Sequence, residues 1–378
     1  MALRKILFVF NGPIFGGAER HTFDLAQGLI SYEFIPVIFA MKAGPLVAPD
    51  SIKMHQPPQP CSLKTRILDL AECIRVERPD VIVTVNERPV LASFIARKLA
   101  KSKIPIAAIL HSTLLKSTKE KIFQLVYTPI LNRIERVIFI SANQRKYWLK
   151  QGMQPKSDVV ILNGIDTSRF SLLAKAHHRA TMRKSLSFVD TDLVIGLSAV
   201  MRAEKNHFQA VRMLERLQSE NVQAKLLLVG DGALRGKIEA YVQAKGLEKH
   251  VVFTGMQSDV RPYIAAFDIG FICSVSVETL SLSALEIMAM GIPMVMSNIG
   301  GASEIIDDTT GRLFEAKDDE GFYNALKSLS SQDTSPKDLL PNNLRINAGN
   351  SSRTKVERLF NHSLMTKSYF KNLSDLVD

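Results

Sequence analysis

Residues 277–293, VETLSLSALEIMAMGIP, are nearly all small or apolar, yet they contain the two carboxylates Glu278 and Glu286. A Gly-Ile-Pro sequence at 291–293 ends the segment. A helix beginning near Leu282 would place Glu278 in the preceding loop and Glu286 in an early turn with almost no polar face. Because a buried carboxylate is costly unless it is paired or hydrogen-bonded, the segment predicts a binding site rather than an ordinary amphipathic helix.

The residues just before this predicted helix favour binding of an anion. Backbone amides at a helix start point outward and attract phosphate, and we expect this of Thr279, Leu280, Ser281 and Leu282. Eight residues span at most roughly 12 Å along a helix axis, which is comparable to a sugar plus a ribose. Carboxylates that accept pairs of hydroxyls, beside amides that hold phosphate, predict a nucleotide-sugar site. The alternative, a surface carboxylate on an amphipathic helix, is disfavoured by the apolar residues around position 286.

Outside this segment, short apolar runs alternate with stretches whose apolar spacing is near 3.6 residues. This alternation occurs twice and predicts two α/β domains with mainly parallel sheets. A polar, basic segment near residues 170–190 separates the two series. The expected strands are residues 6–10, 36–40, 81–85, 106–110, 137–140 and 159–162, then 194–200, 225–229, 251–254, 269–272 and 293–297.

The composition is that of a globular protein, and its charge is unevenly distributed. The 378 residues are 46% hydrophobic and 22% charged, with a net charge of +11. Residues 1–180 contain 26 Lys/Arg against 13 Asp/Glu, whereas residues 181–378 contain 22 against 24. A basic first half is typical of proteins with nucleic acid, anionic lipid or a phosphorylated ligand as neighbour, although a solvated basic surface explains it equally well.

Several function classes are disfavoured by what the chain contains. A nucleic-acid-binding protein is the alternative of a different class, but no basic run is interleaved with aromatics, so we expect no nucleic acid as partner. Three scattered cysteines do not suit a disulfide framework or a zinc site and fit a reducing compartment. No run approaches the length of a membrane span. The sequence gives no indication of oligomeric state.

Glycine-rich turns follow several of the predicted strands. The first strand leads into NGPIFGGAERHTF, in which Gly16 and Gly17 would let backbone amides approach an anion at a helix start. The spacing is not that of the G-x-G-x-x-G dinucleotide fingerprint, and a turn that needs glycine for backbone reasons explains it as well. Gly230 and Gly255 lie at the carboxyl ends of later strands, where open α/β sheets bind ligands.

A basic pair and the lack of metal ligands complete the picture of the site. In RAEKNH, Arg202 and Lys205 are three residues apart after a strand, so both can contact a diphosphate. A solvated helix start would look similar. Asp190-Thr-Asp192 is explained as turn chemistry, and the adjacent His177 and His178 lie on different faces. We therefore expect no metal ion and no cofactor.

Together these motifs resemble those of retaining family-4 glycosyltransferases with the GT-B fold (glycosyl transferases group 1). The resemblance rests on Glu-x7-Glu followed by IMAMGIPMVMSNIGGASEII and TTGRLF, on FGGAERHTFDLAQGL and VILNGIDTSRF, and on RAEKNH, VGDGALR and VVFTG. It implies two Rossmann-like domains with mainly parallel sheets facing across a cleft. The acceptor domain would be residues 1–172 and the donor domain residues 173–357, with a helix at about 358–378 packing back on the first domain.

The resemblance also implies roles for individual residues. Glu286 would hold the ribose hydroxyls and Glu278 the donor sugar, while Arg202 and Lys205 would neutralise the diphosphate and Gly17 would approach it. His111, in AAILHSTLLK, matches the histidine that faces the reacting sugar in the family.

Two departures from the family pattern affect this expectation. Thr279-Leu280-Ser281 stands where many relatives have Gly-Phe-Gly, so the sugar pocket cannot be read from better-known members. Val200 stands where many have arginine, and Arg202, which shares a strand face with it, is the candidate substitute.

The expected activity is that of a retaining, metal-independent, hexosyltransferase-type enzyme. It would move a sugar from a UDP- or GDP-linked donor to a glycan or lipid-linked acceptor in cell-surface polysaccharide or lipopolysaccharide biosynthesis. A nucleotide-sugar epimerase of the same fold is the closest alternative.

The segment after His111 predicts contact with an anionic membrane surface. Three lysines are followed by an apolar face at a spacing that suits an interfacial helix, although a helix packing Leu125 and Val126 into the core fits the same pattern. The lysines are Lys116, Lys119 and Lys121, and the apolar residues are Ile122, Leu125, Val126 and Ile130. The expected location is the cytoplasm, peripheral on the inner membrane.

Overall fold

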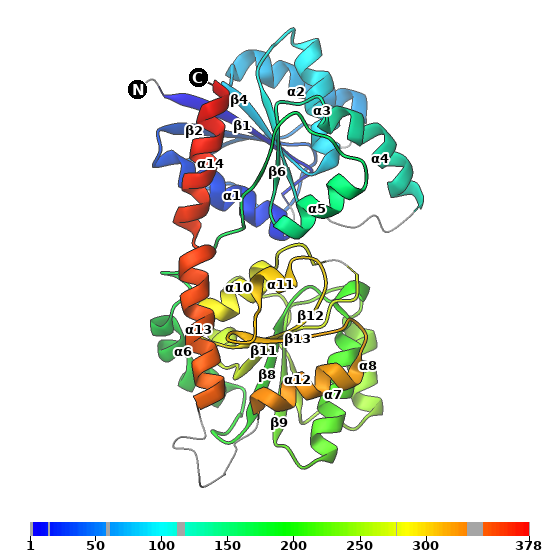
Figure 1. The fold of residues 1–378 in the computed structure, drawn as a ribbon, viewed down its shortest axis with the longest axis vertical. Helices are drawn as coiled ribbons and strands as arrows, with labels where there is room; N and C mark the ends of the chain where they lie inside the picture. Colours follow the sequence, from blue (N-terminus) through cyan, green and yellow to red (C-terminus); the bar gives the residue numbers. More distant parts are fainter. Residues whose placement is uncertain are drawn as a thin grey trace. The chain divides into compact units, whose positions relative to one another are not determined.

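The chain forms two compact units in a computed structural model that describes residues 3–13, 16–57, 61–111, 118–276, 278–330 and 343–377 (Figure 1). Unit 1 consists of Met1–Asn163 together with His362–Asp378, and unit 2 of Gly164–Asn361. The sequence placed the first boundary after residue 172. Residues 164–171 belong to unit 2 because the Arg353 guanidinium donates hydrogen bonds to the carbonyls of Thr167 and Phe170.

Unit 1 contains a seven-stranded parallel sheet in the order β3-β2-β1-β4-β5-β6-β7. Both faces of its central strands are buried, which matches their continuous apolar sequences. The strands are β1 (Arg4–Phe10), β2 (Phe34–Ala40), β3 (Lys53–His55), β4 (Val81–Val85), β5 (Ile106–Leu110), β6 (Arg136–Phe139) and β7 (Asp158–Val160). The helices are α1 (Gly17–Ile30), α2 (Leu63–Glu77), α3 (Glu87–Leu99), α4 (Thr118–Leu131), α5 (Ala142–Lys150) and α14 (His362–Val377).

Unit 2 contains a six-stranded parallel sheet in the order β10-β9-β8-β11-β12-β13. Its strands are β8 (Leu193–Ser198), β9 (Ala224–Val229), β10 (Val251–Phe253), β11 (Ile269–Ile272), β12 (Met294–Ser297) and β13 (Gly311–Phe314). The helices are α6 (Leu172–Ser185), the short 3₁₀ helix η1 (Ala203–Lys205), α7 (His207–Ser219), α8 (Arg235–Ala244), α9 (Arg261–Ala265), α10 (Leu282–Ala289), α11 (Ala302–Ile305), α12 (Asp319–Ser330) and α13 (Asn343–Leu359).

The expected fold class, two Rossmann-like α/β domains with parallel sheets, is confirmed. All eleven predicted strands are present, with ends shifted by at most two residues. The structure adds β3 and β13, two short edge strands with the sequences KMH and GRLF. Neither is a run of apolar residues, so the pattern that revealed the other strands did not reveal these.

Each sheet has a point at which the chain changes direction. In unit 2 the strands after β8 first extend to one side, through β9 and β10, and then to the other side, through β11, β12 and β13. The loops that leave β8 and β11 at their carboxyl ends therefore diverge, and open α/β sheets bind ligands at such points. In unit 1 the equivalent point lies between β1 and β4.

The last helix, α14, packs within unit 1 beside α1 (Figure 1). The ring of Phe370 stacks on that of Tyr32 with 4.8 Å between centroids. His362 Nε2 lies 3.0 Å from the carbonyl oxygen of Asp24 in α1. The Arg136 guanidinium at the start of β6 donates to the carbonyl of Asn372. These contacts make α14 part of unit 1, as the resemblance implied for a helix at about 358–378.

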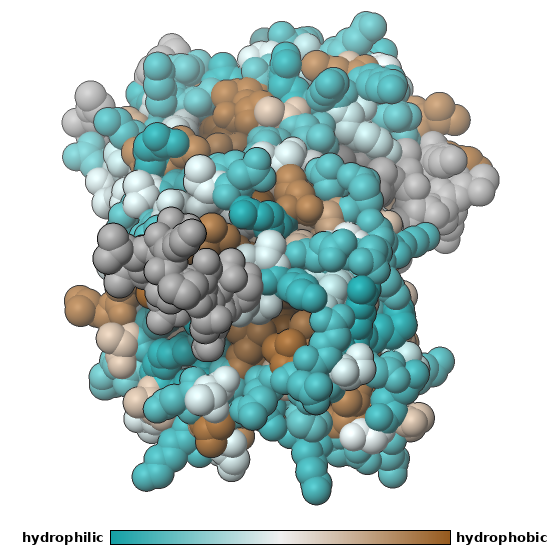
Figure 2. All heavy atoms as spheres, turned by 60° about the horizontal axis from the view of Figure 1, so that its bottom comes forward, coloured by the Kyte–Doolittle hydropathy of each residue, from teal (hydrophilic) through white to brown (hydrophobic). Residues whose placement is uncertain are grey.

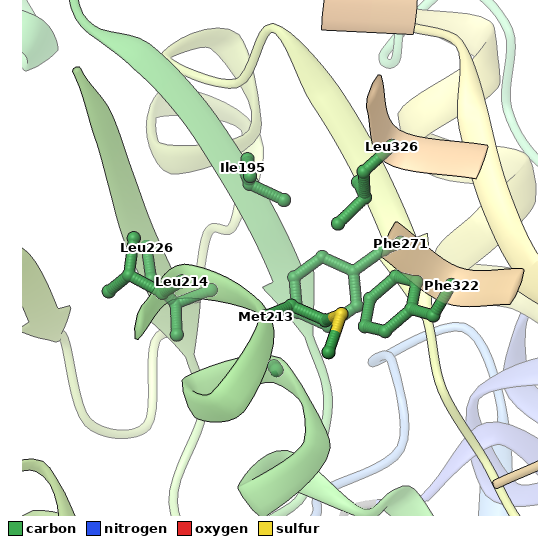
Figure 3. A pocket seen from close by; sticks show the side chains of 8 residues that line it. Ile195, Met213, Leu214, Leu226, Phe271, Phe322 and Leu326 are labelled. Atoms are coloured by element: carbon green, nitrogen blue, oxygen red, sulfur yellow. The ribbon is translucent and has the colours of Figure 1, made fainter. Parts of the chain in front are cut away.

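The core of unit 2 is apolar and closely packed. Figure 3 shows a void of about 10 Å³ whose lining side chains carry no polar group apart from the Met213 sulfur. It is lined by Ile195, Ala210, Met213, Leu214, Leu226, Phe271, Phe322 and Leu326. Its apolar lining and small size identify it as a packing defect and not as a ligand site. The molecular face in Figure 2 is mostly hydrophilic, with scattered hydrophobic residues between.

Candidate active site

The direction change between β8 and β11 brings two predicted site residues into contact. Lys205 ends η1 after β8, and Glu278 follows β11. Lys205 Nζ lies 2.6 Å from Glu278 Oε2, and the Glu278 side chain is largely buried. Ser274 Oγ, which is fully buried, donates to the same carboxylate oxygen at 2.8 Å. One carboxylate oxygen therefore accepts two hydrogen bonds, one of them charge-assisted.

Side chains behind this pair hold the two loops together. The Cys273 thiol donates to the carbonyls of Lys205 and Asn206 at 3.3 and 3.4 Å. Ser297 Oγ in β12 donates to the carbonyl of Ser274 at 2.7 Å. Burial raises the pKa of the Cys273 thiol to about 12, so it is a neutral donor at ordinary pH. Ser274 was not predicted as a site residue, because a serine after a strand gives no signal by itself.

The Gly-Gly turn after β12 supports the backbone at Glu278. Gly301 N donates to the Glu278 carbonyl at 3.2 Å. Gly300 has φ +58°, and a Cβ there would lie 1.7 Å from the Glu278 carbonyl oxygen. Only glycine combines this conformation with such close backbone approach. The Gly-Gly pair of the motif thus fixes the loop that carries the carboxylate.

Helix α10 begins at Leu282, as predicted, and carries the second carboxylate. Ser281 is the N-cap and its hydroxyl accepts from Ala284 N at 3.3 Å. Ser281 is therefore engaged in capping, and its side chain also completes the helix start. Glu286 lies in the second turn with an exposed fraction of 2%, and Thr279 and Leu280 are also buried. The sequence prediction of a carboxylate without a polar helix face around it is confirmed.

Other residues predicted for the donor site lie around the same loops without contacting one another through side chains. Arg202 is the N-cap of η1 and is exposed, and its side chain makes no hydrogen bond or ion pair within the described part of the chain. Gly230 N donates to the Gly255 carbonyl at 3.0 Å. A Cβ on Gly230 would lie 2.2 Å from the carbonyl oxygen of Ala199. Both glycines therefore have a backbone reason for their identity.

In unit 1, the predicted phosphate turn leads into α1. Gly16 is the N-cap of this 14-residue helix in an extended conformation, and Gly17 is its first residue. No side chain caps the helix start, although the Glu19 carboxylate lies close enough that a Cβ on Gly16 would be 2.4 Å from its Oε2. A bound anion would have to displace this carboxylate.

His111 follows β5 and is held by Asn86, which follows β4. The His111 N–H donates to Asn86 Oδ1 at 2.9 Å. Asn86 has φ +66° and ψ 177°, a conformation that costs a non-glycine residue about 1–3 kcal/mol and persists where the surroundings impose it. The ring of His21 in α1 meets that of His111 edge-on, with 4.8 Å between centroids. Burial lowers the pKa of His111 to about 4, so its imidazole is neutral near pH 7.

Potential metal ligands do not gather in the described residues: they contain no group of three or more His, Cys, Asp or Glu suited to a metal ion. Asp192 Oδ2 accepts a hydrogen bond from Val189 N at 2.9 Å, which is the turn role expected for the Asp190-Thr-Asp192 sequence.

Two family signatures together match most of the chain. Residues 15–169 match Glycosyltransferase Family 4, and residues 178–348 match Glycosyl transferases group 1. The chain belongs to the family-4 glycosyltransferases. The first signature falls within unit 1 and the second within unit 2 of this glycosyltransferase, apart from a few residues at the junction.

Individual relatives agree with the family. The glycosyltransferase is 24% identical over 340 residues to the UDP-Gal:alpha-D-GlcNAc-diphosphoundecaprenol alpha-1,3-galactosyltransferase of Escherichia coli, covering 85% of this chain and 87% of that protein. It is 24% identical over 324 residues to the N-acetyl-alpha-D-glucosaminyl L-malate synthase of Bacillus anthracis, covering 83% and 78%. The fold is similar to that of HepE of Anabaena in complex with UDP-glucose, with a TM-score of 0.82 at 18% identity over 98% of this chain and 99% of that one.

Proposed function

We propose that this glycosyltransferase transfers a hexose from a UDP-linked donor to a glycan or lipid-linked acceptor with retention of anomeric configuration. The observation that carries the proposal is the Lys205–Glu278 pair at the direction change of the unit 2 sheet, beside the start of α10 and the buried Glu286. The E. coli relative is named for a UDP-galactose donor and a diphosphoundecaprenol-linked acceptor, and this name supports the choice of substrate classes.

The residues divide the donor between them. In our proposal Glu286 accepts hydrogen bonds from the ribose hydroxyls and Glu278 from hydroxyls of the sugar. Lys205 is held on Glu278 before the donor binds, so its ammonium is already placed where a diphosphate would arrive. Arg202, which is exposed and makes no contact within the described residues, is available to turn onto the phosphates. His111, as a neutral imidazole, forms a hydrogen bond with a hydroxyl of the transferred sugar.

We propose that leaving-group charge is neutralised without a metal ion. When the bond to the sugar breaks, negative charge develops on the diphosphate. Lys205, Arg202 and the free amides before α10 are fixed positive groups that stabilise this charge, as preorganised dipoles and cations do in other active sites. In the free protein Glu278 screens Lys205, so the diphosphate must share the ammonium with the carboxylate.

The activity test uses the intact chain with a panel of UDP- and GDP-hexoses and a synthetic lipid-diphosphate-linked acceptor. We expect transfer from a UDP-hexose, an axial or equatorial product bond matching that of the donor in the NMR spectrum, and unchanged turnover after EDTA treatment. An inverted product contradicts retention, and a strict requirement for manganese or magnesium contradicts the metal-free mechanism. An epimerised nucleotide sugar formed without acceptor would identify an epimerase instead.

We further propose that the acceptor is presented at an anionic membrane surface on the cytoplasmic side, and that α4 contacts this surface. Leu125 and Val126 are 75% and 48% exposed, so the alternative in which they pack into the core is wrong. Ile122 is also exposed, whereas Ile130 is buried and does not belong to the apolar face as predicted. Figure 1 shows α4 on the outer side of unit 1.

The lysines of this segment are only partly covered by the structure. Lys116 lies outside the described residues, and of Lys119 and Lys121 only the backbone is described, within α4. No helix in the described part of the chain is long and apolar enough to cross a membrane. Attachment through an interfacial helix face and basic side chains would be reversible, since each basic residue near an anionic surface contributes about 1 kcal/mol.

Vesicle sedimentation tests the membrane contact. We expect binding to vesicles that contain phosphatidylglycerol, weakening from about 0.05 to about 0.5 M salt as screening increases. The double variant Leu125→Asn/Val126→Asn should lose most binding, whereas Leu99→Asn, which replaces an exposed apolar residue of α3, should not. Binding that ignores lipid charge, or that is equally reduced by Leu99→Asn, would rule out α4 as the contact.

A further inference from the structure

His111 is contacted by residues from two other elements of unit 1, and neither has a role in the proposed reaction. Its backbone N–H is bound by the Asn86 side chain and its ring meets the ring of His21. We propose that Asn86 and His21 are positioning residues for His111, and that α14 supports His21 through Tyr369. This inference rests on the proposed function, which gives His111 its contact with the transferred sugar.

Asn86 joins the carboxyl ends of two neighbouring strands. Its own N–H donates to the Ile109 carbonyl at 2.8 Å, while its Oδ1 accepts from His111 N. These two bonds fix the chain leaving β4 against the chain leaving β5. With φ +66° and ψ 177°, the residue occupies a region that is natural for glycine and strained for asparagine. A strained side chain at this position implies that the side chain itself is needed, and its bond to His111 is the described use for it.

His21 contributes a ring rather than a hydrogen bond. It is buried on α1, and neither ring nitrogen has a hydrogen-bond partner within the described residues. Its ring meets that of His111 at 71°, an arrangement that aromatic pairs favour. Burial, together with the neighbouring His111 and His362, lowers the pKa of His21, so it is neutral and does not repel its neighbour. The edge-on contact limits rotation of the His111 ring.

Tyr369 closes the stack from the far side. Its ring lies 5.7 Å from that of His21 at 64°, and it is completely buried. Its hydroxyl has no hydrogen-bond partner within the described residues, so its contribution is also packing. Tyr369 is on α14, beside α1 in Figure 1. Three segments far apart in the sequence therefore meet in one aromatic column that ends at His111.

The test compares variants that remove each contact with variants that keep it. Asn86→Gly removes the acceptor and relieves the backbone strain, so the chain should fold, whereas Asn86→Asp keeps an acceptor oxygen. His21→Ala removes the ring, whereas His21→Phe keeps an aromatic edge. The matched control is Asn132→Gly, because Asn132 Oδ1 likewise accepts a backbone hydrogen bond, from Gln154 N at 2.8 Å.

We expect Asn86→Gly and His21→Ala to lower kcat by about 10-fold each, since small misplacements of a reacting group have effects of this order or larger. Asn86→Asp and His21→Phe should retain most of kcat, and Asn132→Gly all of it. The affinity for free UDP should not change, because the proposed nucleotide contacts lie in unit 2. In a His111→Ala background, neither Asn86→Gly nor His21→Ala should lower kcat further.

Two results would overturn the proposal. One is an equal loss in the presence and absence of the His111 side chain, which would indicate a structural role for Asn86 and His21. The other is an unchanged His111 imidazole signal in the ¹⁵N NMR spectra of Asn86→Gly and His21→Ala. The NMR measurement needs no substrate, so it tests the positioning of His111 even if the chain proves not to transfer sugar.

Discussion

Lys205→Ala should lower kcat by about 10²-fold or more, the order seen when a preorganised partner of developing charge is removed. The Lys205 ammonium is already fixed on Glu278 at 2.6 Å in the free protein, so no reorganisation is needed when charge appears on the diphosphate. The loss should fall more on kcat than on the Michaelis constant of the donor, because the charge on the leaving group is greatest in the transition state. Steady-state kinetics with the preferred UDP-hexose measures this.

Two companion variants show whether the effect belongs to this ammonium. Lys205→Arg keeps a cation beside Glu278 and should recover part of kcat. Lys249→Ala removes an exposed lysine of the same unit and should have no effect. A loss below about threefold in Lys205→Ala, or an equal loss in Lys249→Ala, would show that the diphosphate is stabilised elsewhere.

Glu286→Gln should weaken binding of free UDP and of the UDP-sugar alike, because both contain the ribose. Loss of a hydrogen bond to a charged group costs roughly 1.5–3 kcal/mol, which corresponds to about 10- to 150-fold in affinity. Glutamine is nearly isosteric with the buried Glu286, so the helix should be retained. Isothermal titration calorimetry with UDP and with a slowly transferred UDP-sugar measures both affinities.

Glu278→Gln is the matched variant for this measurement. It should leave the affinity for free UDP within about threefold and impair turnover, since its proposed partner is the sugar. Glutamine still offers an oxygen to Lys205 and Ser274, which keeps the loop in place. Equal loss of UDP affinity in the two variants would contradict the division of the donor between the two carboxylates.

The sequence predicted those parts of the molecule whose pattern is local. The eleven strands were visible because each is an apolar run between polar turns. The first residue of α10 was visible because an apolar helical stretch follows a serine, and Ser281 is indeed its cap. Glu286 stood out because its neighbours leave no polar face.

Other features depend on residues that only the tertiary structure brings together. The pairing of Lys205 with Glu278 spans 73 positions, and each was predicted for the site separately, with different partners. Ser274, Asn86 and His21 have ordinary local sequences, and their roles arise from neighbours in other elements. The same is true of the domain boundary, which Arg353 sets from nearly two hundred positions away.

The return of α14 to unit 1 has a consequence for how the polypeptide matures on the ribosome. Residues 1–163 emerge first but lack the helix that packs on α1, and all of Gly164–Asn361 must be synthesised before that helix appears. Domains generally fold in the order in which they are made. Here the nascent first domain must wait with the α1 surface uncovered while the second is translated, so it depends on chaperones or on slow collapse for that interval. The aromatic column beneath His111 is complete only at the end of translation.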